Sequence, residues 1–360
     1  MRGQQERQAT MLLGLAPDEF VPADHPIRRI RAVVDAVLRE VSPQFDAMYA
    51  RIGRPSVPPE HLVKASLLMA LYSIPSERQF CERLRYDLLF KWFLGLPITE
   101  PPFDPTSFTK NRQRLLEQDV AVQMLAGVVE EARRQKLLSE DHFSVDGTLM
   151  EAWASLKSVQ PKDDDGPPRG GGRNREANFH GQRRTNATHA STTDPGAKLM
   201  RKGNSQEARL CYAGHLLVEN RNGFIVDAVL TEATGLAERE AALELLERQG
   251  IGSGATLGAD KGYDTRDFVA RLDERGVRPH IARHTTNRRS AVPDVVAAEP
   301  GYRLSQRRRK LVEEPFGWLK TVAQSRKLRY VGVTLNNLWF TFAAAAYNLV
   351  RLAKSRPQCA

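Results

Sequence analysis

Three acidic residues occupy positions from which their carboxylates could bind divalent metal ions. Asp146 stands among alternating apolar and polar residues over 143–149, and Asp260 comes just after the short apolar run 255–258. Glu313 lies in SQRRRKLVEEPFGWLK, a basic segment with helical spacing. Phosphoryl transfer on a diester uses two divalent cations about 3.5–4 Å apart, and such hard cations prefer oxygen ligands. Asp146, Asp260 and Glu313 are therefore the predicted catalytic residues and metal ligands of a two-metal site.

The third acid has a rival at the next position. On a continuous helix Arg309, Glu313 and Lys320 lie within roughly 40° of one another, so one carboxylate shares a face with two cations that could hold phosphate. Taken alone, this trio would be an exposed ion-pair ladder worth tenths of a kcal/mol. Glu314 points about 100° away and precedes Pro315, which is awkward within a helix. We therefore favour Glu313 over Glu314.

The elements needed to position these acids follow from the periodicity of the chain. Strands are predicted at 143–149, 209–218, 224–231, 255–258 and 277–281, with helices at 237–248, 265–275 and from about Ser305 onward. The Asn-Gly pair that ends the segment 220–223 indicates a hairpin turn. This order is the ribonuclease H-like arrangement, an α+β or α/β fold with a mixed five-strand sheet. Its first and fourth strands are neighbours, so Asp146 and Asp260 can converge across 114 positions.

Two domains are predicted, a helical one at 1–138 and the catalytic one at 139–356. Helical spacing recurs over 26–41, from Pro59, from Ser76, and over 107–116 and 120–137. Such a helical bundle beside a basic catalytic domain is a natural site for helix-turn-helix DNA binding, although a structural or dimerising bundle would give the same pattern. The apolar helix 338–352 is expected to pack on the catalytic core or in a dimer interface.

The charge distribution favours a DNA partner. The chain has a net charge of +10, and most of it is concentrated in two segments. Residues 301–330 hold nine Lys and Arg against two Glu, and residues 169–202 hold eight against two acids. Residues 156–206 are rich in Gly, Pro, Asp, Arg and Asn and predict a long, mobile, basic loop. Within it Arg201 and Lys202 are DNA-contact candidates, whereas Asp194 in Asp-Pro-Gly indicates a turn.

Other classes of site are not indicated. Cys81, Cys211 and Cys359 are far apart and lack the paired spacings of zinc sites or disulfide frameworks, and the histidines are not spaced as metal ligands. The first residues contain an apolar run too short for a secretory signal, and no stretch reaches membrane-spanning length. These features predict a cytoplasmic protein, without a membrane partner. An aromatic side chain at Trp318 could stack on a flipped base, but a core position is the favoured interpretation.

Together the motifs resemble those of DDE transposases of bacterial insertion sequences, in the insertion-sequence-four and insertion-sequence-five types. The resemblance extends from RPSVPPEHLVKASLLMALYSIPSERQFCERLRYDLLFKWFLGL through SVDGTLMEAWAS, THASTTDPGAKLMRKG and GADKGYDT to RRRKLVEEPFGWLK. The terminal signature of that family, Tyr-x2-Arg-x3-Glu-x6-Lys, falls on Arg309, Glu313 and Lys320. The Tyr position is Gln306 here, which leaves the three acids intact and the role of that position open.

The resemblance implies two Mg²⁺ or Mn²⁺ ions at the three acids, with Arg309 and Lys320 contacting DNA near the cleaved bond. Water would free a 3′-hydroxyl at the element end, and that hydroxyl would attack target DNA without a covalent protein–DNA intermediate. The implied partners are the terminal inverted repeats and target DNA, at the nucleoid. Because the reaction must hold two element ends together, we expect a homodimer when DNA is bound. Two alternatives remain at this point, namely a structure-specific nuclease without strand transfer and a catalytically inactive DNA-binding regulator. The short interval of 53 positions between Asp260 and Glu313 implies no large β-rich insertion before the glutamate.

Overall fold

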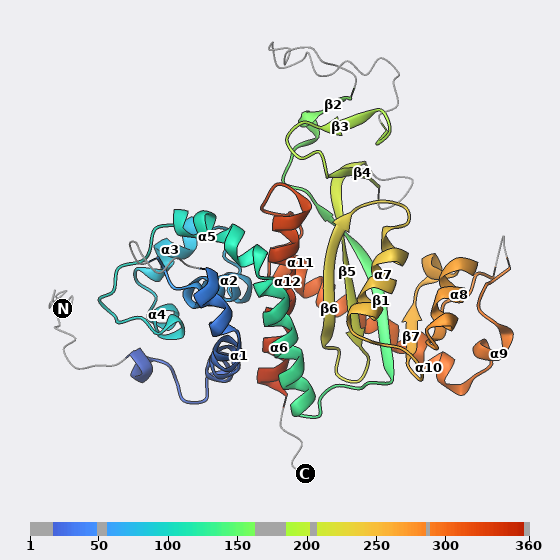
Figure 1. Cartoon of the computed structure of the whole chain (residues 1–360), viewed down its shortest axis with the longest axis horizontal. Coiled ribbons are helices and arrows are strands. Elements are labelled where there is room, and N and C mark those ends of the chain that lie inside the picture. Colours follow the sequence, from blue (N-terminus) through green and yellow to red (C-terminus); the bar gives the residue numbers. More distant parts are fainter. Residues whose placement is uncertain (1–16, 49–55, 163–184, 202–206, 286–288, 356–360) are drawn as a thin grey trace, which may run out of the picture.

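A mixed sheet lies at the centre of the structure. The computed structural model describes residues 17–48, 56–162, 185–201, 207–285 and 289–355 (Figure 1). β1 pairs antiparallel with β5 and parallel with β7, β5 pairs antiparallel with β6, and β7 pairs parallel with β8. These strands are β1 (His142–Glu151), β5 (Arg209–Glu219), β6 (Ile225–Glu232), β7 (Thr256–Ala259) and β8 (Arg278–Ile281). Their order, β6-β5-β1-β7-β8, confirms the predicted ribonuclease H-like sheet.

Opposite faces of the sheet have different coverings, because side chains alternate along each strand. Phe143 and Val145 of β1 belong to an apolar cluster with α7 (Ala237–Arg248) and α8 (Arg266–Glu274). Met150 belongs instead to the cluster that includes α11 (Glu313–Thr321) and α12 (Val333–Lys354). Asp146 lies four residues before Met150 on β1, so its side chain is on the same face of the sheet. The sheet therefore presents Asp146 toward the side of the C-terminal helical segments.

The amino-terminal part of the chain is helical, as predicted. Its elements are η1 (Pro17–Phe20), α1 (Pro26–Met48), α2 (Pro59–Leu71), α3 (Glu77–Leu84), α4 (Leu88–Leu94), α5 (Thr106–Glu117) and α6 (Val120–Arg134). The predicted stop of the first helix near residue 41 is wrong, because α1 continues through Pro43. Proline inside a helix removes one backbone hydrogen bond and crowds the carbonyl four residues earlier, but Phe45 beyond it is buried in the core. That burial offsets the local cost.

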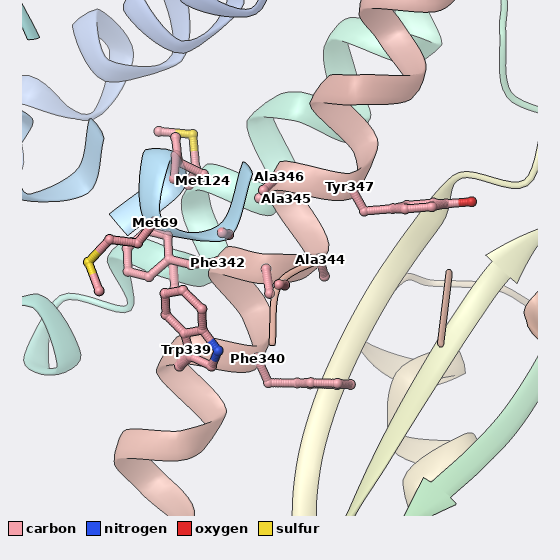
Figure 2. Close-up of a cluster of buried hydrophobic side chains, with 14 of the residues drawn as sticks. Met69, Met124, Trp339, Phe340, Phe342, Ala344, Ala345, Ala346 and Tyr347 are labelled. Atoms are coloured by element: carbon pink, nitrogen blue, oxygen red, sulfur yellow. The ribbon is translucent and has the colours of Figure 1, made fainter. Parts of the chain in front are cut away.

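Helix α12 joins the helical region to the sheet. In Figure 2, Trp339 and Phe342 point toward the amino-terminal helices, where Met69 and Met124 lie, whereas Phe340 and Tyr347 point toward the strands. The Phe340 ring packs so closely on Gly214 of β5 that a Cβ atom there would lie 2.9 Å from it. The chain therefore has one continuous core across the predicted boundary at residue 138, and the packing predicted for the helix 338–352 is confirmed.

The same helix also provides hydrogen-bond partners for backbone groups along the outer edge of β6. Asn348 accepts a hydrogen bond from the Ile225 amide at 2.9 Å and donates one to the Ile225 carbonyl at 2.7 Å. Asn337 accepts from the Leu230 amide at 2.8 Å. Unpaired edge groups would otherwise be free to pair with another chain. These contacts fix the register of α12 against the sheet, and with it the position of the α11 segment that precedes it.

The predicted loop at 156–206 is wrong where the structure describes it. Residues 156–162 and 185–201 contain η2 (Leu156–Ser158), β2 (Val159–Pro161), β3 (His189–Ser191) and β4 (Lys198–Met200). β2 pairs with β3, and β4 extends the main sheet beside β5. In the described part of the chain the sheet therefore has six strands instead of the five predicted. Asp194 is buried in the turn between β3 and β4, where it accepts a hydrogen bond from the Tyr212 hydroxyl at 2.5 Å. Residues 163–184 and 202–206 lie outside the described residues.

The hairpin predicted around 220–223 is confirmed, and a buried carboxylate holds it. Glu219 is fully buried at the end of β5 and accepts hydrogen bonds from four backbone amides, those of Ser139, Arg221, Asn222 and Phe224, at 2.7–3.2 Å. Gly223 has φ +70°, a left-handed conformation that glycine adopts without strain. The side chain of Glu219 thereby ties the turn to the segment that precedes β1.

None of the helices in the described parts of the chain combines the length and apolar character needed to span a bilayer.

Removing the Glu219 carboxylate is expected to destabilise the fold. Glu219→Ala leaves buried amides without acceptors, so the free energy of unfolding should fall by about 2–4 kcal/mol. Urea denaturation followed by circular dichroism measures this change. The control is Glu130→Ala, which removes an exposed ion pair with Arg133 and should change stability by less than about 0.5 kcal/mol. Equal stability of the two variants would contradict the role given to Glu219.

Candidate active site

Asp146 and Asp260 are brought together by the parallel pairing of β1 and β7. Ser144 lies opposite Gly258 in this register, so each acid stands two residues beyond a paired position. Burial is the main cause that raises the pKa of Asp146 to about 7, and the charges of Asp260 and Glu238 raise it further. Arg309 and a hydrogen bond from the Gly147 amide act in the opposite direction. The predicted convergence of the two aspartates is thus supported by their electrostatic interaction.

Backbone amides orient both aspartates. The Gly147 amide donates to Asp146 Oδ1 at 2.8 Å, and the Gly262 amide donates to Asp260 Oδ1 at 2.8 Å. Asp260 therefore also caps the short η4 helix (Lys261–Tyr263) that follows β7. A cap and a metal ligand are compatible roles, since one carboxylate oxygen suffices for the cap.

The helix expected from about Ser305 is interrupted. The structure has α10 (Pro300–Arg308), η5 (Arg309–Val312) and α11 (Glu313–Thr321) in succession. Pro315 has no amide hydrogen to donate to the Leu311 carbonyl, and its ring would clash with that carbonyl in a continuous α-helix. A 3₁₀ turn before Glu313 places Pro315 in the first turn of α11, where it is tolerated. The single helical face assumed for Arg309, Glu313 and Lys320 is therefore wrong.

Arg309 and Lys320 nevertheless both lie at the acid-bearing face of β1. Arg309 is near enough to Asp146 for its charge to lower the pKa of that carboxyl. Lys320 donates a hydrogen bond to the Thr148 hydroxyl, two residues beyond Asp146 and on the same face. Two cations thus border the aspartates, as a site for DNA phosphates would require.

Gln306 has a visible role at the position where it departs from the resembled signature. Its Nε2 donates to the His280 carbonyl at the end of β8 at 2.6 Å, and its Oε1 accepts from Arg309 Nε at 3.1 Å. The amide therefore links the β8 backbone to the guanidinium beside Asp146. This positioning role was not apparent from the sequence.

The two glutamates at the start of α11 have different surroundings. Glu314 forms an ion pair with Arg351 of α12 at 2.7 Å, so it is directed away from the aspartates. Glu313 is exposed. Among the residues described, no three His, Cys, Asp or Glu side chains are close enough to hold one metal ion. The structure therefore brings Asp146 and Asp260 together without Glu313, whose role stays a prediction.

A further acid, Glu238, lies beside the two aspartates and was not singled out in the sequence. It occupies the first turn of α7, and its charge contributes to raising the pKa of Asp146. Glu238 is an exposed residue, but local burial of its carboxyl raises its pKa, and the charge of Asp260 adds to that effect. The sequence feature that could have pointed to Glu238 is its place in the first turn of the helix that follows the third predicted strand.

The remaining predicted positions give mixed outcomes. Arg201 is exposed just after β4, whereas Lys202 lies outside the described residues. Trp318 packs edge-on against Tyr347 with the ring centroids 5.7 Å apart, which confirms the core interpretation.

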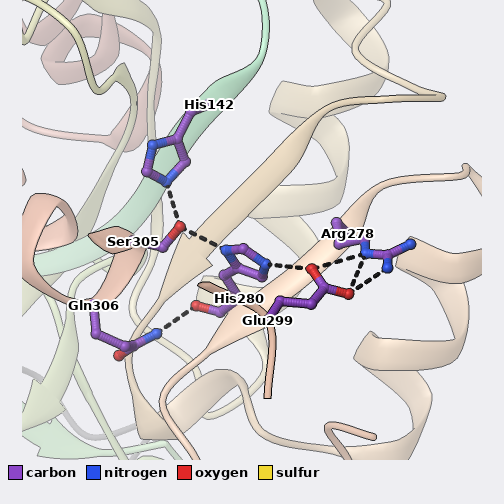
Figure 3. Close-up of polar contacts among 6 residues, drawn as sticks. All are labelled: His142, Arg278, His280, Glu299, Ser305 and Gln306. Carbon is purple, nitrogen blue, oxygen red and sulfur yellow. Dashed lines mark hydrogen bonds and ion pairs between the residues drawn. The ribbon is translucent and has the colours of Figure 1, made fainter. Parts of the chain in front are cut away.

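A buried polar network holds α10 against the sheet. Ser305 Oγ lies 2.8 Å from His142 Nε2 and 2.6 Å from His280 Nδ1, and His280 Nε2 lies 3.4 Å from Glu299, which pairs with Arg278 (Figure 3). Burial lowers the pKa of His142 to about 4, and the charges of His280 and Arg308 contribute. A neutral His142 can share a hydrogen bond with Ser305. The network thereby fixes the residues immediately before Gln306 and Arg309.

The fold and this set of residues define a class of protein. A ribonuclease H-like sheet with two adjacent aspartates, bordered by cations, is the framework of a polynucleotidyl transferase. A family model described as a transposase DDE domain matches residues 139–349, and one described as a transposase domain (DUF772) matches residues 15–114. The chain therefore belongs to the DDE transposase family and is a DDE-type DNA transposase.

Individual relatives are distant. Curated protein sequences gave no match. Among solved structures, the piggyBac transposase synaptic complex with hairpin DNA is similar with 7% identity and a TM-score of 0.39, over 93% of this chain and 77% of that one. The Mos1 transposase paired-end complex with left transposon end is similar with 12% identity and a TM-score of 0.21, over 85% of this chain and 98% of that one.

The low pKa of His142 predicts an acid-sensitive anchor for α10. Its folded pKa of about 4 lies below the ordinary 6.5, so its stabilising effect is complete above pH 6.5 and is lost as the pH falls toward 4. His142→Gln keeps a hydrogen-bonding partner for Ser305 but cannot titrate. From pH 7 to pH 5 the wild type should lose about 1 kcal/mol more stability than this variant, measured by urea denaturation.

The matched control for this experiment is His189→Gln, which lies outside the network and should follow the wild type. A His142→Gln variant as acid-sensitive as the wild type would show that His142 does not titrate as described.

Proposed function

We propose that Asp146, Asp260 and Glu313 bind two Mg²⁺ or Mn²⁺ ions and that the enzyme cleaves element ends and joins them to target DNA. The observation that carries this proposal is the adjacency of Asp146 and Asp260 at the β1–β7 junction, with Arg309 and Lys320 beside them. The motif pattern supports an element of the insertion-sequence-four or insertion-sequence-five type. We include Glu313 as the third acid and not Glu314, because the Glu314 carboxylate forms an ion pair with Arg351.

The residues present fit hard divalent cations. Carboxylate oxygens are the preferred donors for Mg²⁺ and Mn²⁺, and the aspartates are carried by two neighbouring interior strands, Asp146 within β1 and Asp260 just after β7. Mutual repulsion and burial oppose ionisation of Asp146, and a bound cation would relieve both effects. When bound, the ions would activate the attacking oxygen and stabilise the leaving oxygen of the phosphodiester.

The side chains around the aspartates have distinct roles in this proposal. Arg309, held by Gln306, would bind a phosphate oxygen next to Asp146. Lys320, anchored on Thr148, would bind a neighbouring phosphate along the same face of β1. Both cations would hold the DNA strand so that water, and later the 3′-hydroxyl, approaches the phosphorus in line. No covalent bond to the protein is needed.

DNA contacts beyond the active site are also proposed. The helical region 1–138 would bind the terminal inverted repeats, which is supported by the transposase-domain match over 15–114 and by the exposed Lys110 and Arg114 on α5. Arg201 and Lys202 would contact flanking DNA. Because two element ends must be held together, we propose a homodimer on DNA. Its place would be the cytoplasm, at the nucleoid, where the DNA substrate lies.

Strand transfer of a pre-cut element-end oligonucleotide into plasmid tests the proposal. Loss of a metal ligand removes several kcal/mol of transition-state stabilisation, so Asp146→Asn, Asp260→Asn and Glu313→Gln should each lower joining by about 10³-fold or more. EDTA should abolish joining, and added Mn²⁺ should restore it. The control Asp267→Asn changes an exposed acid on α8 and should keep wild-type activity.

Each contrary result has a defined meaning. Cleavage without joining would indicate the nuclease alternative, and DNA binding without either reaction would indicate the inactive regulator. Full joining by Glu313→Gln would remove Glu313 from the site.

A further inference from the structure

We propose that Glu238 is a further carboxylate of the metal centre, which helps Asp146 and Asp260 to bind a hydrated divalent cation once that ion draws the three side chains together. In the metal-free arrangement no three such side chains among the described residues already form a site. The inference rests on the proposed function and adds a residue that the three-acid pattern does not contain. Its basis is the position of the Glu238 carboxylate between the β1 backbone and the turn after β7, next to two buried polar atoms that have no hydrogen-bond partner among the described residues.

The Glu238 side chain lies directly over Gly147. A Cβ atom added to Gly147 would stand 2.9 Å from Glu238 Cγ and 3.0 Å from its Oε1. A Cβ atom on Gly262 would stand 3.8 Å from Glu238 Oε2 and 3.0 Å from Asp260 Oδ1. One carboxylate oxygen of Glu238 therefore faces the residue after Asp146, and the other faces the turn that Asp260 caps. The glycine at position 147 provides the space for this approach.

The topology explains how an acid from the opposite face reaches this place. Gly147 follows Asp146 directly on β1, so it faces the opposite side of the sheet. That side is the one covered by α7. β7 pairs with β1 only as far as Ser144 and Gly258, and β1 then continues with that edge uncovered by β7. Glu238, in the first turn of α7, can thus approach Asp146 around the open edge.

Two buried polar atoms point to a ligand at this position. His215 is fully buried opposite Gly147, and its Nδ1 would lie 3.1 Å from the same Gly147 Cβ point as Glu238 Oε1. Its Nε2 bonds to Thr231, but Nδ1 has no hydrogen-bond partner among the residues described. The hydroxyl of buried Tyr263 also lacks a partner there, and its electrostatic neighbours are Glu238, Asp146 and Asp260. Leaving such buried atoms without a hydrogen-bond partner is energetically costly.

A hydrated cation in the acid cluster accounts for these features together. Its positive charge would offset the repulsion among three carboxylates, and its bound water could bridge to His215 Nδ1 and the Tyr263 hydroxyl. Neighbouring acids on α7 differ, since Glu240 pairs with Arg271 at 2.9 Å and Glu244 with Arg248 at 3.4 Å. Within the described part of the chain, Glu238 has no such ion pair. Its carboxylate is therefore available to a cation.

Calorimetric titration of the full chain with Mn²⁺ tests the inference without any DNA reaction. Glu238→Gln, which keeps the shape of the side chain, should weaken Mn²⁺ binding by about 10–100-fold. Glu240→Gln on the same helix is the matched control and should bind within about twofold of the wild type. In EDTA, Glu238→Gln should melt at or above the wild-type temperature, because it removes repulsion. The rise in melting temperature on adding Mn²⁺ should be smaller than in the wild type.

Asp146→Asn in the same titration separates the two possible failures. If Asp146→Asn loses binding while Glu238→Gln binds as tightly as the wild type, Glu238 is not a ligand and the proposed function stands. If neither change affects Mn²⁺ binding, the proposed metal centre itself is absent and the inference falls with it. Loss of binding in both, with Glu240→Gln unchanged, supports Glu238 as a ligand.

Discussion

The parallel hydrogen bonds between β1 and β7 create the active site, because they place two aspartates from distant parts of the sequence side by side. Ser144 faces Gly258, and each strand continues two residues to its acid. The same closeness is electrostatically unfavourable, and with burial it raises the pKa of Asp146. A fold that holds carboxylates close together against their mutual repulsion favours the binding of cations between them. The neighbouring features, from Arg309 to Glu238, are arranged around that charge cluster.

The cluster keeps its geometry because two helical segments are anchored from different directions. α12 is packed between the amino-terminal helices and the sheet, and its asparagines satisfy the edge of β6 (Figure 1). α10 is held against β1 and β8 through Ser305, His142 and His280. The segment between these anchors carries Arg309, Glu313 and Lys320. The helical region and the catalytic region thus share one core.

Strand order and the two aspartates were predictable from sequence, because alternation and the Asn-Gly turn are local signals. The interruption at η5 was not, since its cause is the position of Pro315 relative to a helix whose start depends on tertiary anchoring. Continuation of α1 through Pro43 likewise depends on the burial of Phe45. The proximity of Glu238 to Asp146 required a glycine at 147 and an open strand edge, neither of which periodicity reveals. For Glu313 the reverse holds. Its position in the sequence motif is clear, but its side chain is exposed in the structure.

The most direct test of the metal centre is anomalous X-ray scattering from crystals of the full chain grown with Mn²⁺. The structure predicts an anomalous peak between the carboxylates of Asp146 and Asp260. A well-occupied Mn²⁺ peak elsewhere, with no density between these aspartates at saturating Mn²⁺, would contradict the assignment of this site.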